Sequence, residues 1–182
     1  MKPSKKKIIL ILMAGIVYLA IGIMFTQSQR DYMYKVKSNK GEFIAMMKPK
    51  IEKFNQDQPD GKKLPYKLVI AVSALETGWG TSRFAKEANN YFGEWTWTQD
   101  GIVPSNRKEG LTHKIRKFEN IEDSIRGFYH NINNHNAYKG LRKIREDAEI
   151  VTAELLLPGL LHYSERKEEY LKLLDRVIKS IN

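Results

Sequence analysis

The segment AVSALETGWG, residues 71–80, carries the strongest structural signal of the sequence. Apolar residues recur at helical spacing from Leu68 to Leu75, which predicts a buried helix. Gly78 and Gly80 follow directly, and glycine is the residue that most often ends a helix.

Glu76 falls in the last turn of the predicted helix. A carboxylate there lies near the negative end of the helix dipole, which disfavours its ionised form. Val72 and Trp79, at i−4 and i+3, are expected to shield it from water. Both effects raise the pKa, as a general acid that protonates a glycosidic oxygen requires. The alternative is a solvated carboxylate without a chemical role.

Composition excludes several classes of protein. The chain has 182 residues, a formal net charge of +10 and no cysteine. The length suits one domain with an appendage. Without sulfur there can be no disulfide scaffold, cysteine-based zinc finger or thiol nucleophile. The basic residues are scattered rather than arranged in an arginine-aromatic array, so no nucleic-acid partner is expected.

The N-terminus predicts a membrane segment. Residues 1–7 are basic, and residues 8–25 are uninterrupted by charge. Eighteen helical residues span roughly 27 Å, close to the thickness of the hydrocarbon core. The basic end should stay in the cytoplasm, so we expect a single-pass signal-anchor in the cytoplasmic membrane with the remaining chain on the periplasmic or extracytoplasmic side. A signal peptide cleaved near Ala20-Ile21-Gly22 is the alternative.

The chain after the anchor divides into a polar tether, residues 26–40, and a domain, residues 41–182. Helical periodicity dominates the domain, beginning with a helix that Pro49 should kink or split in two. A short helix is expected from about Ser82. Alternation between Glu94 and Phe118 predicts one β-hairpin. Further helices are expected at about 121–133, 136–146 and 152–157 and at the C-terminus, giving an α+β fold that is mainly helical.

The run SALETGWGTSRFAKEANNYFGEW resembles the catalytic-helix signature of glycoside hydrolase family 73, the bacterial N-acetylglucosaminidases that cut peptidoglycan, most closely its Bax-like branch. The similarity continues through GIVPSNRKEGLTHKIRKFEN and NNHNAYKGLR and covers roughly residues 41–182. It implies a lysozyme-like fold in which an α lobe and a β-hairpin wall a glycan cleft. It also implies that Glu76 is the general acid, matching the Glu of the family's A-L-E-x-x-W-G element.

Glycoside hydrolysis usually needs a second carboxylate, as base or nucleophile. In the family the second carboxylate lies on the β-hairpin, and Glu109 is the residue of this chain that best matches its position. Arg107 and Lys108 beside it would keep it ionised, as a base requires. An ordinary turn glutamate balancing two cations is the alternative. The other candidates are Glu94, Asp100 and Glu119.

The 2-acetamido group of the substrate offers another route, because it can attack the anomeric carbon itself. Tyr138 matches the tyrosine that the family places in the cleft, where it would stabilise positive charge or orient water. The sequence does not choose between an inverting and a substrate-assisted mechanism.

The predicted substrate-binding residues lie close to Glu76 in sequence. Asn90, Phe92 and Gly93 match the family's Asn-x-Phe-Gly element, although Phe92 also suits the core and Asn90 could tie the loop. Glu94 agrees with the Bax-like branch and could tune the cleft. Trp95 and Trp97 share one face of the strand and could stack on sugar rings or cover the core of the hairpin. Trp79 completes the set.

No cofactor or metal is expected. The four histidines lack the spacing of a zinc site, and there is no phosphate-binding loop or serine-hydrolase elbow. The sequence predicts a membrane-anchored hydrolase that binds peptidoglycan strands and cleaves the β-1,4 bond on the reducing side of N-acetylglucosamine. The alternatives are a lysozyme or lytic transglycosylase, or a non-catalytic wall-binding or scaffolding protein.

Overall fold

The computed structural model describes residues 29, 39–105 and 107–181. The chain divides into two compact units, Met1–Glu42 and Phe43–Asn182, and the fold described below is that of the second unit. The predicted anchor, residues 8–25, and most of the predicted tether lie outside the described residues. Among the residues that are described, no helix is both long and apolar enough to cross a membrane.

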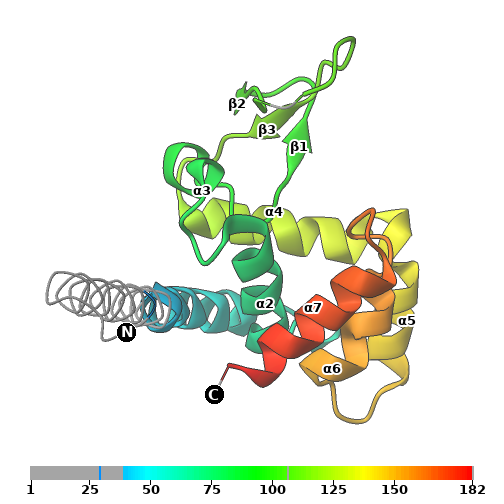
Figure 1. The fold of residues 1–182 in the computed structure, drawn as a ribbon. Helices are drawn as coiled ribbons and strands as arrows, with labels where there is room; N and C mark the ends of the chain where they lie inside the picture. Colours follow the sequence, from blue (N-terminus) through cyan, green and yellow to red (C-terminus); the bar gives the residue numbers. More distant parts are fainter. Residues whose placement is uncertain (1–28, 30–38, 106, 182) are drawn as a thin grey trace, which may run out of the picture. The chain divides into compact units, whose positions relative to one another are not determined.

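The second unit is mainly helical with a small sheet, as an α+β lysozyme-like fold predicts (Figure 1). Figure 1 shows the sheet and α3 on one side of α4, with α2, α5, α6 and α7 on the other. Residues 43–56 are helical and precede the short 3-10 helix η1, Asp60–Lys62. The later elements are α2 (Tyr66–Thr77), α3 (Arg83–Ala88), β1 (Trp95–Thr96), β2 (Gly101–Ile102), β3 (Lys114–Arg116), α4 (Ile121–Asn134), η2 (Asn136–Tyr138), α5 (Lys139–Asp147), α6 (Ala153–Leu156), η3 (Leu157–Leu160) and α7 (Glu168–Lys179).

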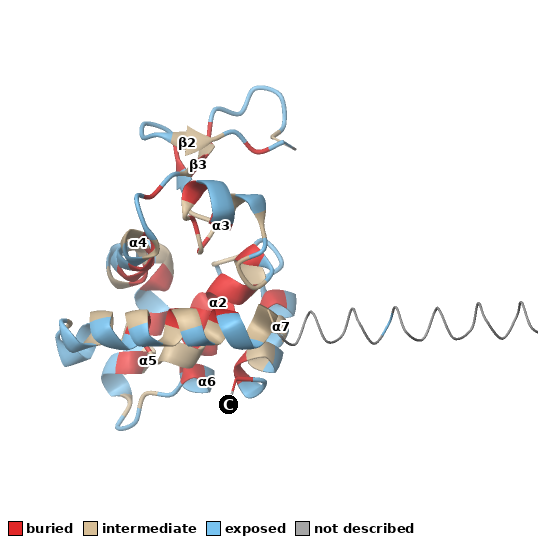
Figure 2. Ribbon diagram, turned by 90° about the vertical axis from the view of Figure 1, so that its left-hand side faces the viewer, coloured by how far each residue is buried: buried red, intermediate tan, exposed pale blue. Residues whose placement is uncertain are grey.

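Helix α2 forms the centre of the core. Eight of its twelve residues are buried, including every residue from Leu68 to Ala74, so the helix is covered on all sides (Figure 2). It packs against α6 and α7. The buried hydroxyls of Ser73 and Thr77 donate to backbone carbonyls one turn back, so that they are not left unpaired. The helix that carries Glu76 is therefore held within the core of the unit.

The predicted single hairpin is instead a three-stranded antiparallel sheet of order β1-β3-β2. The alternating run that begins at Trp95 stops after Thr96, because the Thr96 hydroxyl accepts the backbone N–H groups of Thr98 and Gln99 and turns the chain. Gly101 then pairs with Arg116 on the other side of β3, where an added Cβ would lie only 2.5 Å from the Ile115 carbonyl oxygen.

The helix that contains Pro49 is continuous, whereas the sequence predicted that Pro49 would kink it or split it in two. Residues 43–56 are helical without interruption, so the two-part alternative is wrong. Proline removes one backbone hydrogen bond from a helix. Burial of Phe43, Met47 and Ile51 on one face of this helix offsets that loss. The helix expected from Ser82 is confirmed as α3, and the Ser82 hydroxyl caps it by accepting the N–H of Ala85.

Candidate active site

A large open cleft of about 1240 Å³ runs between the sheet and the helices. Its walls come from the end of α2, the loop before β1, the strands β1 and β3, one face of α4, and the loop before α7. Of the predicted site residues, those that line it are Glu76, Phe92, Gly93, Glu94, Trp95, Trp97 and Tyr138. The predicted residues Trp79, Asn90 and Glu109 do not line it.

The Glu76 carboxyl is held from two sides. The Tyr170 hydroxyl, from α7, donates to Oε1 at 2.8 Å. Oε2 faces Gly93, where an added Cβ would lie 2.9 Å away. Burial raises the pKa of Glu76, while the Tyr170 hydrogen bond and the positive charge of Arg166 act in the opposite direction. The raised pKa expected from the sequence is confirmed, although the neighbours at the carboxyl are Tyr170 and Gly93.

The three residues that follow α2, close after Glu76, have an unusual backbone conformation. Gly78, Trp79 and Gly80 all have positive φ angles, of 56°, 60° and 75°. A tryptophan in this region is strained, since its Cβ crowds the backbone. Trp79 is held there by edge-to-face packing on Phe43, with ring centroids 6.0 Å apart. Trp79 therefore packs against Phe43 within the turn that follows Glu76, and it does not line the cleft.

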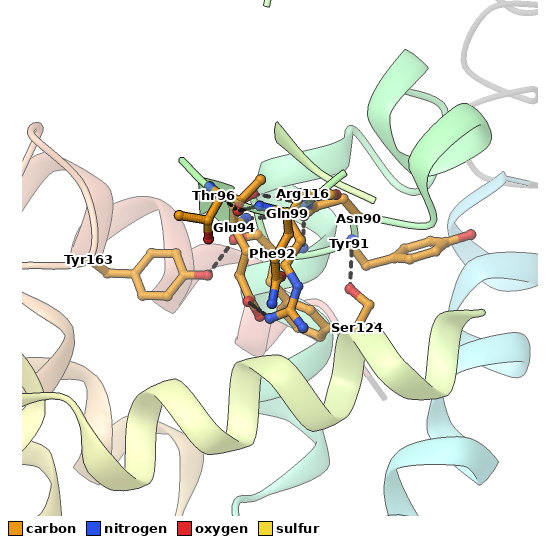
Figure 3. A network of polar contacts seen from close by, with 10 residues as sticks. Asn90, Tyr91, Phe92, Glu94, Thr96, Gln99, Arg116, Ser124 and Tyr163 are labelled. Carbon is orange, nitrogen blue, oxygen red and sulfur yellow. Dashed lines mark hydrogen bonds and ion pairs between the residues drawn. The ribbon is translucent and has the colours of Figure 1, made fainter. Parts of the chain in front are cut away.

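Asn90 ties the loop before β1 to β3. Its Nδ2 donates to the carbonyl oxygens of Glu94 and Arg116, and its Oδ1 accepts the N–H groups of Phe92 and Glu94 (Figure 3). The Tyr163 hydroxyl binds the Phe92 carbonyl in the same network at 2.7 Å. These contacts hold Gly93, at φ 68°, against the acid. Asn90 thus has the loop-tying position that the sequence allowed for it.

Glu94 supplies the second partly buried carboxyl of the cleft. Arg116 donates to its Oε2 at 3.4 Å, and its Oε1 is buried with no hydrogen-bond partner among the described residues. Burial raises its pKa to about 7, and the charge of Arg116 only partly opposes this. The carboxyl presses against α4 at Gly127, where an added Cβ would lie 2.5 Å from Oε1.

Three tyrosines stand beside the two carboxyls. The rings of Tyr163 and Tyr170 stack with centroids 5.8 Å apart, and the ring of Tyr138 lies 6.1 Å from that of Tyr163. Burial raises the pKa of Tyr138 to about 12, and the charges of Glu76 and Glu94 add to the effect. All three phenols therefore stay protonated near neutral pH and can act as hydrogen-bond donors.

Trp95 and Trp97 are exposed on the cleft wall, at 53% and 64% of their surfaces, so they do not cover a core of the sheet. Trp95 stacks on the ring of His113 with a centroid distance of 4.2 Å. Exposed indole faces in a cleft provide flat apolar surfaces of the kind on which sugar rings pack.

The structure separates the four candidates for a second carboxylate. Glu94 and Glu119 line the cleft, whereas Asp100 and Glu109 lie elsewhere on the sheet lobe. Glu109 is an exposed residue of the turn that precedes β3. Within the described residues, no group of three or more histidine, aspartate or glutamate side chains is placed to hold a metal ion.

Comparison with known sequences decides the family. The profile of the glucosaminidase family, described as mannosyl-glycoprotein endo-beta-N-acetylglucosaminidase, matches residues 54–182. The chain belongs to this family. It is accordingly a glycoside hydrolase, and the similarity to glycoside hydrolase family 73 noted in the SALETGWG run is confirmed.

Among curated relatives, protein Bax of Escherichia coli (strain K12) is 29% identical to this glucosaminidase-family chain over 111 residues. That alignment covers 59% of this chain and 39% of protein Bax, so the chain spans well under half the length of this relative.

Solved structures share the fold at low sequence identity. The catalytic domain of the autolysin Auto from Listeria monocytogenes is 21% identical with a TM-score of 0.57, over 78% of this chain and 84% of that domain. A peptidoglycan hydrolase from Sphingomonas sp. A1 is 22% identical with a TM-score of 0.56, over 75% of this chain and 86% of its own. The glycoside hydrolase domain of FlgJ from Salmonella typhimurium is 20% identical with a TM-score of 0.57, over 79% and 97%.

Sequence reasoning missed Tyr163, Tyr170 and Arg116. Tyr170 belongs to the apolar stripe of the last helix, a pattern that indicates burial of its ring but gives no sign that its hydroxyl binds Glu76. No local pattern marks Tyr163 or Arg116. Their contacts with Phe92 and Glu94 span 71 and 22 residues of sequence and exist only in the folded chain.

Replacing Glu94 with Gln should change the pH dependence of stability. The folded-state pKa of about 7 exceeds the ordinary 4.5, so the folded chain binds this proton more tightly than the unfolded chain. The wild type should therefore lose stability as pH rises from about 4.5 through 7, by up to about 3 kcal/mol. Glu94→Gln lacks this loss. Urea unfolding at pH 4.5 and pH 8 should show the variant gaining on the wild type at pH 8, and an unchanged difference would contradict the buried state of Glu94.

Proposed function

We propose that this glycoside hydrolase is a membrane-anchored peptidoglycan hydrolase that cleaves the β-1,4 bond on the reducing side of N-acetylglucosamine, with Glu76 as the general acid. The observation that carries this proposal is a partly buried carboxyl with a raised pKa that lines a cleft of about 1240 Å³. The fold shared with the autolysin Auto and the Sphingomonas peptidoglycan hydrolase supports peptidoglycan as the polymer.

The contacts of Glu76 suggest which oxygen delivers the proton. Oε1 accepts the Tyr170 hydroxyl, so the proton of the neutral acid belongs on Oε2. Oε2 lies beside Gly93, itself a cleft residue, and the absence of a side chain there leaves room for a glycosidic oxygen to approach. Glu76 would protonate that oxygen as the bond to the anomeric carbon breaks.

For the attack on the anomeric carbon we propose the substrate-assisted route. The acetamido oxygen would attack the anomeric carbon as the leaving sugar departs, and water would then open the cyclic intermediate. Tyr138, a buried phenol beside both carboxyls, would orient the acetamido group or the water. Glu109, the carboxylate expected from the sequence, could act as base only if its turn closed over the cleft, since it does not line it.

The anchor at residues 8–25 would keep the cleft close to the membrane. A flexible tether of about fifteen residues has an average reach of roughly 20 Å. The enzyme would then act on wall near the outer face of the cytoplasmic membrane.

The reaction should be identified from the chain ends it creates. Purified full-length chain, incubated with peptidoglycan, should produce ends that become N-acetylglucosaminitol on borohydride reduction, as detected by mass spectrometry. Glu76→Gln should reduce their formation at least about a hundredfold, because it removes the proton donor. Glu109→Gln should keep substantial activity if the substrate-assisted route operates.

Other products would point to the alternatives. Reduced muramitol ends would indicate a lysozyme, and 1,6-anhydromuramic ends a lytic transglycosylase. Binding without turnover by both the wild type and Glu76→Gln would indicate a wall-binding protein. Any of these results would overturn the proposed specificity.

The membrane assignment has a separate test. Membranes from cells that express the chain should retain it after extraction at high pH, which strips peripheral proteins, and deletion of residues 8–25 should release it. Recovery of the intact, uncleaved chain in the soluble fraction would contradict an anchor.

A further inference from the structure

A smaller cavity of about 310 Å³ adjoins the main cleft at Glu76. It is lined by Leu75, Glu76, Ser164, Arg166, Tyr170 and Leu173. Glu76, Ser164 and Arg166 also line the main cleft, so the two hollows meet at the acid. A polymer bound at Glu76 would therefore have the smaller cavity beside the acid as well as the main cleft.

Arg166 gives the smaller cavity its charge. Glu76 and Arg166 are its only charged lining residues. When Glu76 holds the proton that the reaction needs, the guanidinium is left as the one formal charge there. Within the described part of the chain, that guanidinium forms no ion pair or hydrogen bond, whereas Arg116 and Arg126 in the main cleft are paired with Glu94 and Asp123.

The turn that carries Arg166 is held in an unusual conformation. The Ser164 hydroxyl accepts the N–H of Arg166, and the Ser164 carbonyl accepts the N–H of Lys167. Lys167 has a φ of 47°, which costs free energy for a residue with a side chain. The Arg166 carbonyl in turn accepts the N–H of Glu169 at the start of α7. The backbone beneath the guanidinium is therefore well fixed.

Without a bound ligand, the position of Arg166 is unfavourable for the function of Glu76 as an acid. Its positive charge lowers the pKa of Glu76, although a general acid works better with a raised one. An anionic ligand at Arg166 would cancel this effect and satisfy the five donors of the guanidinium. The unpaired charge beside the acid is thus explained if the substrate itself brings a negative group.

We propose that Arg166 and the smaller cavity form a subsite for a carboxylate carried by the glycan, on a sugar bound next to Glu76. This inference rests on the proposed function, because peptidoglycan is a glycan whose muramic acid units carry carboxylates, either on the stem peptide or on the lactyl group once the peptide is removed. The subsite would make the enzyme prefer such strands over uncharged polymers of N-acetylglucosamine.

The test measures binding without turnover. Full-length Glu76→Gln, in which the glutamine imitates the neutral acid, is pelleted with insoluble peptidoglycan, native or with its carboxyl groups converted to amides. Adding Arg166→Gln should weaken binding to native wall about five- to tenfold, as expected for one charge-assisted contact. On amidated wall the two chains should bind equally, which also shows that Arg166→Gln is folded.

Arg176→Gln is the matched control, since it removes the same charge from the exposed face of α7 outside both hollows. It should leave the affinity for native wall unchanged. Glycan strands from which an amidase has removed the peptide distinguish the two sources of the carboxylate. If Arg166→Gln weakens binding to these strands, the ligand is the lactyl carboxylate. If it weakens binding only to intact wall, the ligand is a carboxylate of the peptide.

Two results would overturn the subsite: equal binding of native wall with and without Arg166→Gln, or the same loss on amidated wall. Failure of the Glu76→Gln parent to bind any wall would instead refute peptidoglycan as the substrate, and the subsite with it.

Discussion

The hydrogen bond between Tyr170 and Glu76 joins the core of the fold to its chemistry. Glu76 lies in the last turn of α2, at the centre of the core, and Tyr170 lies on α7, which packs against α2. The same helix pairing that buries the apolar core therefore also sets the orientation of the carboxyl. Gly93 lies beside the other carboxyl oxygen, and hydrogen bonds of Asn90 and Tyr163 hold the loop that carries it. A site built this way moves little, because each contact is shared with the packing around it.

Backbone strain collects around the acid. The non-glycine residues with left-handed φ among those described are Trp79, Asn89 and Lys167, and the first and last flank Glu76 and Arg166. Such conformations persist only where the surroundings enforce them, here the packing of Trp79 on Phe43 and the hydrogen bonds of Ser164. The cost is consistent with a catalytic helix end and a neighbouring turn that are held for function rather than for stability.

Periodicity predicted much of the fold, because it reports burial along one element at a time. It located α2, α3, α4 and α7 and the acid at the end of α2. It could not show that Thr96 would turn the chain and put Gly101 on the other side of β3, since that depends on hydrogen bonds and a close backbone approach. The resemblance to the family placed Trp79 and Asn90 among the residues of the cleft. Both instead support the loops that shape it, while Tyr170 and Arg166 reach the acid from about ninety residues away.

The central claim is that burial at the end of α2 raises the pKa of the Glu76 carboxyl, as a proton donor requires, and direct titration of that carboxyl tests it most closely. In the full-length chain labelled with ¹³C at the glutamate carboxyl groups, the resonance lost in Glu76→Gln identifies Glu76. We expect its midpoint above the ordinary value of 4.5, because burial outweighs the effects of Tyr170 and Arg166. A midpoint at or below 4.5 would show that burial does not raise the pKa of Glu76 and would contradict its role as the proton donor.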